Sequence, residues 1–181
     1  MPTIIEHFAQ SKLKEILQAA DFESYFGVKL REIPQGPGIT GDYWVRESST
    51  YLDSIMGEPC FNKRIEFKYE KKSSQTGNVF CEYEQTSDGG CTFKKSGWVK
   101  AIDDGCILVV QLHTNGESPY LLFNEETFAV LLKAAFRQTR TTRCSNGNPV
   151  TLHQMGHLIK VPRAIEAARH TFSMAAGVPG L

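Results

Sequence analysis

Residues 64–70, "RIEFKYE", decide how this 181-residue chain is interpreted. Ile65 and Phe67 alternate with Glu66 and Lys68. An apolar/polar period of two is the pattern of a β-strand that has one face against a hydrophobic core. The charged face of such a strand is either a solvated surface or a functional site, and the rest of the chain must decide between them.

The composition predicts one globular domain over residues 1–181, with a helix over 3–20, a core over 42–165 and a tail over 175–181. Apolar residues make up 41% of the chain, and no run approaches the roughly 18 apolar residues of a membrane span. The first residues show no basic segment leading into an apolar one. We therefore expect a cytoplasmic protein with no membrane partner.

The chain contains twenty basic and twenty acidic side chains, so its net charge is zero. A neutral chain is a poor candidate for a protein whose affinity rests on a large, sequence-independent phosphate footprint. Any contact with nucleic acid is therefore expected to be confined to a local surface.

The order of the predicted elements points to an α/β fold, with a mixed sheet flanked by helices. The helix over 3–20 is followed by strands in "DYWVRE" and "TYLDSI", and then by the strand at 64–70. Next come the alternating strand "NVFCEYEQ", the irregular stretch "CTFKKSGWVKAIDD", the buried central strand "CILVVQL" and the strand "YLLF". The chain ends with a helix over 125–138 capped by Asn124, a short strand "GHLIKV" and a helix from Pro162 to about 173.

Glu66 and Lys68 lie two positions apart in the strand, so their side chains point the same way, about 6.6 Å apart. If "TYLDSI" pairs beside them as a strand, Asp53 converges on the same point. Two carboxylates and the carbonyl of Phe67 would suit Mg²⁺, which keeps several waters on its other positions. Such a site fits phosphodiester hydrolysis, in which the metal activates a water and the ammonium of Lys68 steadies developing negative charge.

Asp53 followed by "IEFK" resembles the D…(D/E)xK signature of the PD-(D/E)xK, or restriction-endonuclease-like, nuclease superfamily. The series "IEFKYEKKSSQTGNVFCEYEQ" and then "KKSGWVKAIDDGCILVVQL" is similar to small phage-type members. The resemblance covers roughly residues 42 to 165. It implies a restriction-endonuclease-like core and a Mg²⁺-dependent DNA endonuclease, in which Mn²⁺ is expected to substitute for Mg²⁺. It also implies Asp53 and Glu66 as metal-binding acids, Lys68 as the catalytic lysine, and a homodimer acting on DNA.

Several alternatives remain open from the sequence. Asp42 in "TGDYW" rivals Asp53 as the first acid, at a longer spacing. Glu6 or Glu15 on the first helix, or Glu82 on the next strand, would complete the site. Glu6 has a competing role in the capping box of the first helix.

Two other functions also remain open. In the first, the chain has the nuclease fold without the catalytic activity and binds DNA or protein in a phage or mobile element. In the second, it is an α/β domain in which the charged face of the 64–70 strand is a solvated surface without a function.

Overall fold

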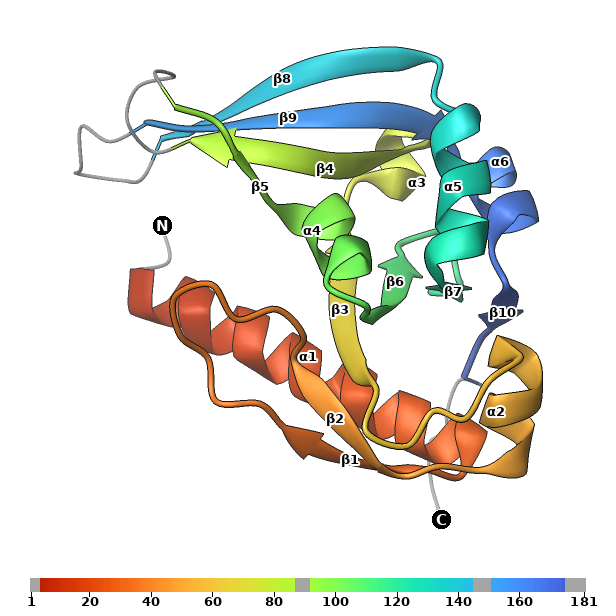
Figure 1. Ribbon diagram of the computed structural model, residues 1–181. Coiled ribbons are helices and arrows are strands. Elements are labelled where there is room, and N and C mark those ends of the chain that lie inside the picture. The colour runs from red at the N-terminus through yellow and green to blue at the C-terminus, as the bar shows by residue number, and fades with distance from the viewer. Residues whose placement is uncertain (1–3, 87–91, 145–150, 175–181) are drawn as a thin grey trace.

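The structure is a computed structural model that describes residues 4–86, 92–144 and 151–174. A six-stranded sheet, with strand order β1-β2-β3-β6-β7-β10, forms its centre (Figure 1). β3 and β6 pair in parallel, and their neighbours pair antiparallel. The strands are β1 (Lys29–Glu32), β2 (Tyr43–Glu47), β3 (Arg64–Glu70), β6 (Ile107–Leu112), β7 (Tyr120–Phe123) and β10 (His170–Phe172).

A second sheet has the order β5-β4-β9-β8 and is antiparallel throughout. Its strands are β4 (Asn78–Thr86), β5 (Lys94–Lys95), β8 (Arg137–Cys144) and β9 (Thr151–Lys160). β4 follows β3 in the chain after the short helix α3 (Ser73–Thr76), so the charged face of β3 leads directly into this sheet.

Helices flank the six-stranded sheet, as the sequence predicted. α1 (Ile4–Phe26) runs behind β1 and β2 in Figure 1, and α2 (Thr50–Met56) lies near the C-terminal end of α1. α4 (Gly97–Asp103), α5 (Glu125–Lys133) and α6 (Val161–Ala167) pack with residues of both sheets. None of the helices within the described residues is long and apolar enough to cross a membrane.

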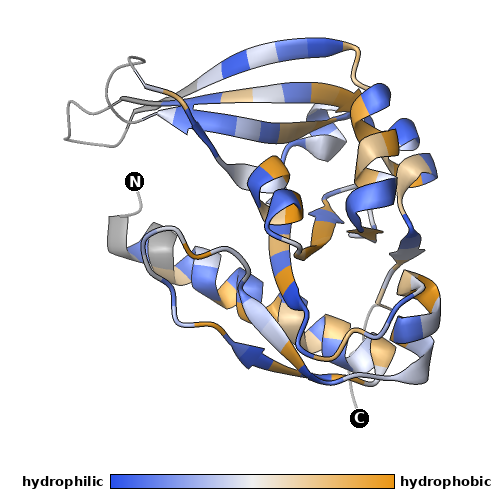
Figure 2. Ribbon diagram, viewed as in Figure 1, coloured by the Kyte–Doolittle hydropathy of each residue, from blue (hydrophilic) through white to orange (hydrophobic). Residues whose placement is uncertain are grey.

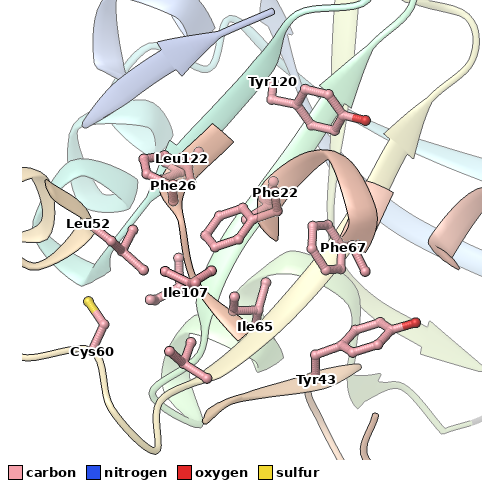
Figure 3. Packing of buried hydrophobic residues seen from close by; sticks show 14 of the residues in the cluster. Phe22, Phe26, Tyr43, Leu52, Cys60, Ile65, Phe67, Ile107, Tyr120 and Leu122 are labelled. Atoms are coloured by element: carbon pink, nitrogen blue, oxygen red, sulfur yellow. The ribbon is translucent and has the colours of Figure 1, made fainter. Parts of the chain in front are cut away.

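The two faces of the six-stranded sheet carry separate hydrophobic clusters. Phe22 and Phe26 of α1 pack against Ile65 and Phe67 of β3 on one face (Figure 3). On the other face, side chains of β6 and β7 pack against α4, α5, α6 and the second sheet. All six residues of β6 are buried, which confirms the prediction of a central strand covered on both sides.

The predicted alternation in β3 is confirmed. Ile65 and Phe67 are buried, whereas Glu66 and Lys68 are partly exposed. The alternation is visible along the β3 ribbon in Figure 2. Parallel pairing of Glu66 with Leu108 places Glu66 on the sheet face opposite α1.

The strand predicted at "TYLDSI" is wrong, because these residues form α2. The side chain of Ser49 accepts a hydrogen bond from the amide of Leu52 and caps the helix, and Gly57 ends it in the left-handed conformation. Leu52 and Met56, one turn apart, supply the buried stripe.

Other boundaries also differ from the predictions. The helix expected over 125–138 ends at Lys133, and 137–144 form β8 instead, paired with a β9 that is longer than predicted. The last helix ends at Ala167 and is followed by β10, and the stretch expected to be irregular contains β5 and α4. The first helix continues to Phe26, beyond the predicted end. Its predicted first residue and the tail predicted over 175–181 lie outside the described residues.

Candidate active site

Glu66 and Lys68 form the centre of a charged site on β3. The Nζ of Lys68 lies 2.5 Å from Oε1 of Glu66, and their side chains are 29% and 14% exposed. The backbone carbonyl of Lys68 accepts a hydrogen bond from the buried Gln18 of α1, at 3.1 Å. This hydrogen bond links β3 to α1 and fixes the position of the Lys68 backbone relative to the helix.

Asp42 reaches this site because β2 and β3 separate beside it. The amide of Asp42 donates to the carbonyl of Ile65 at 2.6 Å, which is the last backbone contact between the two segments on this side. Beyond it, the amide of Phe67 donates to Oδ2 of Asp42, also at 2.6 Å. The N–H and C=O of an extended residue point to the same edge, so the carbonyl of Phe67 faces the Asp42 side.

Gly41 fixes the position of both acids. Its φ of +89° is a left-handed conformation that favours glycine. A Cβ at this position would lie 2.9 Å from the Cβ of Arg64, so a side chain has no room. The Gly41 amide donates to Oε2 of Glu66 at 2.7 Å, and Asp42 follows directly.

The loop before Gly41 is anchored on the end of α4. The Oγ1 of Thr40 donates to Oδ2 of Asp104 at 2.5 Å, and Lys100 pairs with the same carboxylate at 2.5 Å. Arg64 donates to the backbone carbonyls of Thr40 and Asp104. This network holds the segment that carries Asp42 against the start of β3.

Burial and like charge make Asp42 an unusual carboxyl group. Burial and then the charge of Glu66 raise its pKa from 3.8 to about 7, against the opposing hydrogen bond from Phe67. Burial opposes the charge of Lys68, but Glu66, followed by Asp42 and Glu82, raises the pKa of Lys68. The site therefore holds a protonated lysine beside two acids that repel each other.

Asp53 does not join this site, and the strand on which its assignment depended is absent. Its Oδ1 accepts hydrogen bonds from Oγ of Ser48 at 2.5 Å and from the amide of Cys60 at 2.8 Å. The hydrogen bonds from Ser48 and Cys60 hold the pKa of Asp53 below its usual value. Asp53 therefore stabilises the segments around α2. Asp42, the alternative first acid in the sequence, lies beside Glu66 and Lys68 instead.

The acids considered as further ligands have different surroundings. Glu15 of α1 pairs with Lys12 at 2.7 Å, and its charge reaches Asp42. Glu82 accepts hydrogen bonds from Ser96 and Gln154, each at 2.5 Å, and its charge reaches Lys68. Glu6 lies exposed in the first turn of α1.

The donor set at the site is compatible with a divalent ion. Within the described ranges, no three His, Cys, Asp or Glu side chains come close enough together to hold a metal ion by themselves. Mg²⁺ commonly binds proteins through one or two carboxylates and completes its shell with waters and substrate phosphates. Asp42, Glu66 and the Phe67 carbonyl fit that pattern. A cation would relieve the repulsion by Glu66 that, in addition to burial, raises the pKa of Asp42.

The groups that position this site were not predicted from the sequence. Gly41 and Gln18 do so through an amide and a side-chain donor, and the pattern around Glu66 gives no sign of either. One available signal was the glycine directly before Asp42 at the start of a predicted strand. A glycine there indicates a turn or a close approach of the backbone.

Comparison with protein-family models, with curated proteins and with solved structures found no match to this chain.

Proposed function

We propose that this protein is a metal-dependent nuclease that hydrolyses phosphodiester bonds in DNA, with Asp42, Glu66 and Lys68 at its active site. The observation that supports the proposal is the partly buried Asp42–Glu66 pair beside a protonated lysine. Perturbed titratable groups of this kind gather at catalytic sites. Asp42 takes the role that the sequence resemblance gave to Asp53.

Each residue has a specific task in this proposal. Asp42, Glu66 and the carbonyl of Phe67 would hold Mg²⁺, or Mn²⁺ in its place. The bound ion would supply Lewis acidity and a water of lowered pKa. Lys68 donates hydrogen bonds to the phosphoryl oxygens as negative charge develops there. Gly41 and Gln18 keep Glu66 and Lys68 in place through the contacts described above.

The proposal extends to the features that the resemblance implies. We infer a restriction-endonuclease-like core of the small phage type, built around β3 and β6, and a cytoplasmic homodimer that acts on DNA. The mixed sheet flanked by helices is compatible with such a core.

The test is a cleavage assay on linear, circular and branched DNA with Mg²⁺, Mn²⁺ or EDTA. Lys68→Ala and Asp42→Asn should each slow metal-dependent cleavage by about 10²–10³-fold, the effect of losing one transition-state contact. Lys133→Ala, which removes a lysine at the exposed end of α5, is the matched control. Equal cleavage by all variants with unchanged circular dichroism would refute the assignment. DNA binding without cleavage by the unmodified chain would favour an inactive accessory protein.

A further inference from the structure

A tryptophan surrounded by arginines lies on the sheet face that carries Asp42 and Glu66. Trp44 of β2 pairs in register with Arg31 of β1 on one side and with Arg64 of β3 on the other. Arg46 lies two residues further along β2, so alternation places it on the same face. We call these four residues the arginine–tryptophan platform.

This face is distinct from the one that α1 covers. Tyr43 and Val45, the neighbours of Trp44 in β2, are buried in the cluster with α1. Alternation therefore directs Trp44 away from the helix. Trp44 is half-buried, whereas Arg31 and Arg46 are exposed.

Two of the three arginines lie close to the indole ring. The guanidinium carbon of Arg46 is 5.4 Å from the ring centroid, and that of Arg64 is 6.0 Å away. Arg46 also donates to Oδ1 of Asn62 at 2.8 Å, a neutral partner that leaves its charge intact. Guanidinium planes and indole rings are both surfaces on which nucleic-acid bases stack.

The glutamates of β1 and β2 do not neutralise the platform, because each is paired with a lysine. Glu32 of β1 lies 2.5 Å from Nζ of Lys12, and Glu47 of β2 lies 2.7 Å from Nζ of Lys29. In the part of the chain that the structure describes, no ion pair joins Arg31, Arg46 or Arg64 to a carboxylate. Hydrogen bonds from Lys100 and Thr40 and, more weakly, the charge of Arg64 lower the pKa of Asp104. Lys100 also forms an ion pair with that carboxylate.

The platform is continuous with the candidate active site. Trp44 follows Asp42 by two positions and Arg64 precedes Glu66 by two, so about 6.6 Å of strand separates each pair. A polynucleotide strand whose phosphate lies at Asp42 and Glu66 therefore reaches Trp44 with an adjoining nucleotide.

We propose that the arginine–tryptophan platform binds a DNA strand with unpaired bases next to the scissile phosphate. A base stacks on Trp44 or on the guanidinium of Arg46, while Arg31 and Arg46 contact phosphates. Inside a duplex, both faces of a base are covered by its neighbours, so stacking on a protein ring requires an unpaired or displaced base. The placement of the scissile phosphate rests on the proposed function, whereas the binding itself does not.

The experiment measures binding of a short fluorescein-labelled single strand, and of the blunt duplex of the same sequence, by fluorescence anisotropy in EDTA. The full chain should bind the single strand more tightly. Trp44→Ala should weaken single-strand binding by about 5- to 150-fold, which is the range for loss of one stacked base, and should change duplex binding little. Trp44→Phe should retain most of the affinity. Arg46→Ala should reduce the slope of log K against log salt by about 0.7, as expected for one lost phosphate contact.

Phe136→Ala is the matched control, since Phe136 is 52% exposed, directly precedes β8 of the second sheet, and has its ring centroid 4.9 Å from the Nζ of Lys160. Four results would each overturn the platform: equal losses of affinity for Trp44→Ala and Phe136→Ala, equal losses of affinity for single strand and duplex, tighter binding of the duplex, or no DNA binding.

Cleavage assays distinguish the platform from the proposed nuclease activity. Platform-dependent binding without cleavage would refute only the nuclease, and cleavage of single strands that Trp44→Ala leaves unchanged would refute only the platform.

Discussion

Replacing Asp42 with asparagine should stabilise the metal-free protein near neutral pH while slowing metal-dependent cleavage by about 10²–10³-fold. Folding places Asp42 where burial and Glu66 raise its pKa from 3.8 to about 7. Between these values the folded state binds a proton that the unfolded state releases. The stability of the wild-type chain therefore falls as pH rises from about 4 to about 7.

The size of the effect follows from that shift. A rise in pKa from 3.8 to about 7 corresponds to at most about 4 kcal/mol of lost stability once Asp42 is ionised. Asparagine keeps an oxygen to accept the hydrogen bond from Phe67, but a neutral acceptor forms a weaker bond than a carboxylate, by about 1 kcal/mol. We therefore expect Asp42→Asn to gain about 2–3 kcal/mol at pH 8. For a domain of this size, that gain raises Tm by roughly 5–10 °C.

The assay is urea unfolding of both chains in EDTA at pH 4 and pH 8, followed by the same titrations with Mg²⁺. The gain should be small at pH 4, where Asp42 is protonated in the folded wild-type chain. Saturating Mg²⁺ should stabilise the wild type by about 2.7 kcal/mol at one hundred times its Kd, and the variant by less. Equal stabilities of the wild type and Asp42→Asn at pH 8, or a gain in stability that is the same at pH 4 and pH 8, would refute the raised pKa of Asp42 as the cause.

Two further substitutions distinguish a role in stabilising the fold from a role at the active site. Asp53→Ala removes the acceptor of two hydrogen bonds and should cost about 1–3 kcal/mol in urea unfolding, with cleavage unchanged; a selective loss of cleavage would return Asp53 to the active site. Gly41→Ala should cost about 1–3 kcal/mol through its positive φ, and should weaken Mn²⁺ binding measured by calorimetry because the amide that holds Glu66 moves. Unchanged Mn²⁺ affinity in Gly41→Ala would contradict that positioning role.

Local periodicity was sufficient for the central strands and insufficient for the elements around them. β3 and β6 followed from an alternation and from a buried run, each of which lies within one short window. α2 was missed although its signals were local: Ser49 and Gly57 are cap residues, and Leu52 and Met56 have helical spacing. The β-branched threonines of β8 favour a strand, but nothing between Lys133 and Arg137 marks the end of a helix. The hydrogen bond from the amide of Phe136 to the carbonyl of Leu158, which is distant in the sequence, decides that boundary.

The site depended on tertiary geometry in the same way. Glu66 and Lys68 lie side by side because a strand places them there, so the sequence was enough to predict their proximity. The choice between Asp42 and Asp53 depended on which segment pairs with β3, and the spacing along the chain does not reveal this. Gly41 and Phe67 act through backbone amides, which leave little trace in a side-chain pattern.

The net charge of zero conceals a separation of charge within the six-stranded sheet. Lysines on α1 and β1 neutralise Glu32 and Glu47, whereas Arg31 and Arg46 remain without a carboxylate partner among the described residues. The adjoining Asp42–Glu66 pair repels phosphate unless a cation or a proton lies there. The two parts of the proposed DNA path should therefore respond differently to metal. Divalent ions should strengthen DNA contact at the acidic pair, and they should leave stacking on Trp44 unchanged except for the screening that any salt produces.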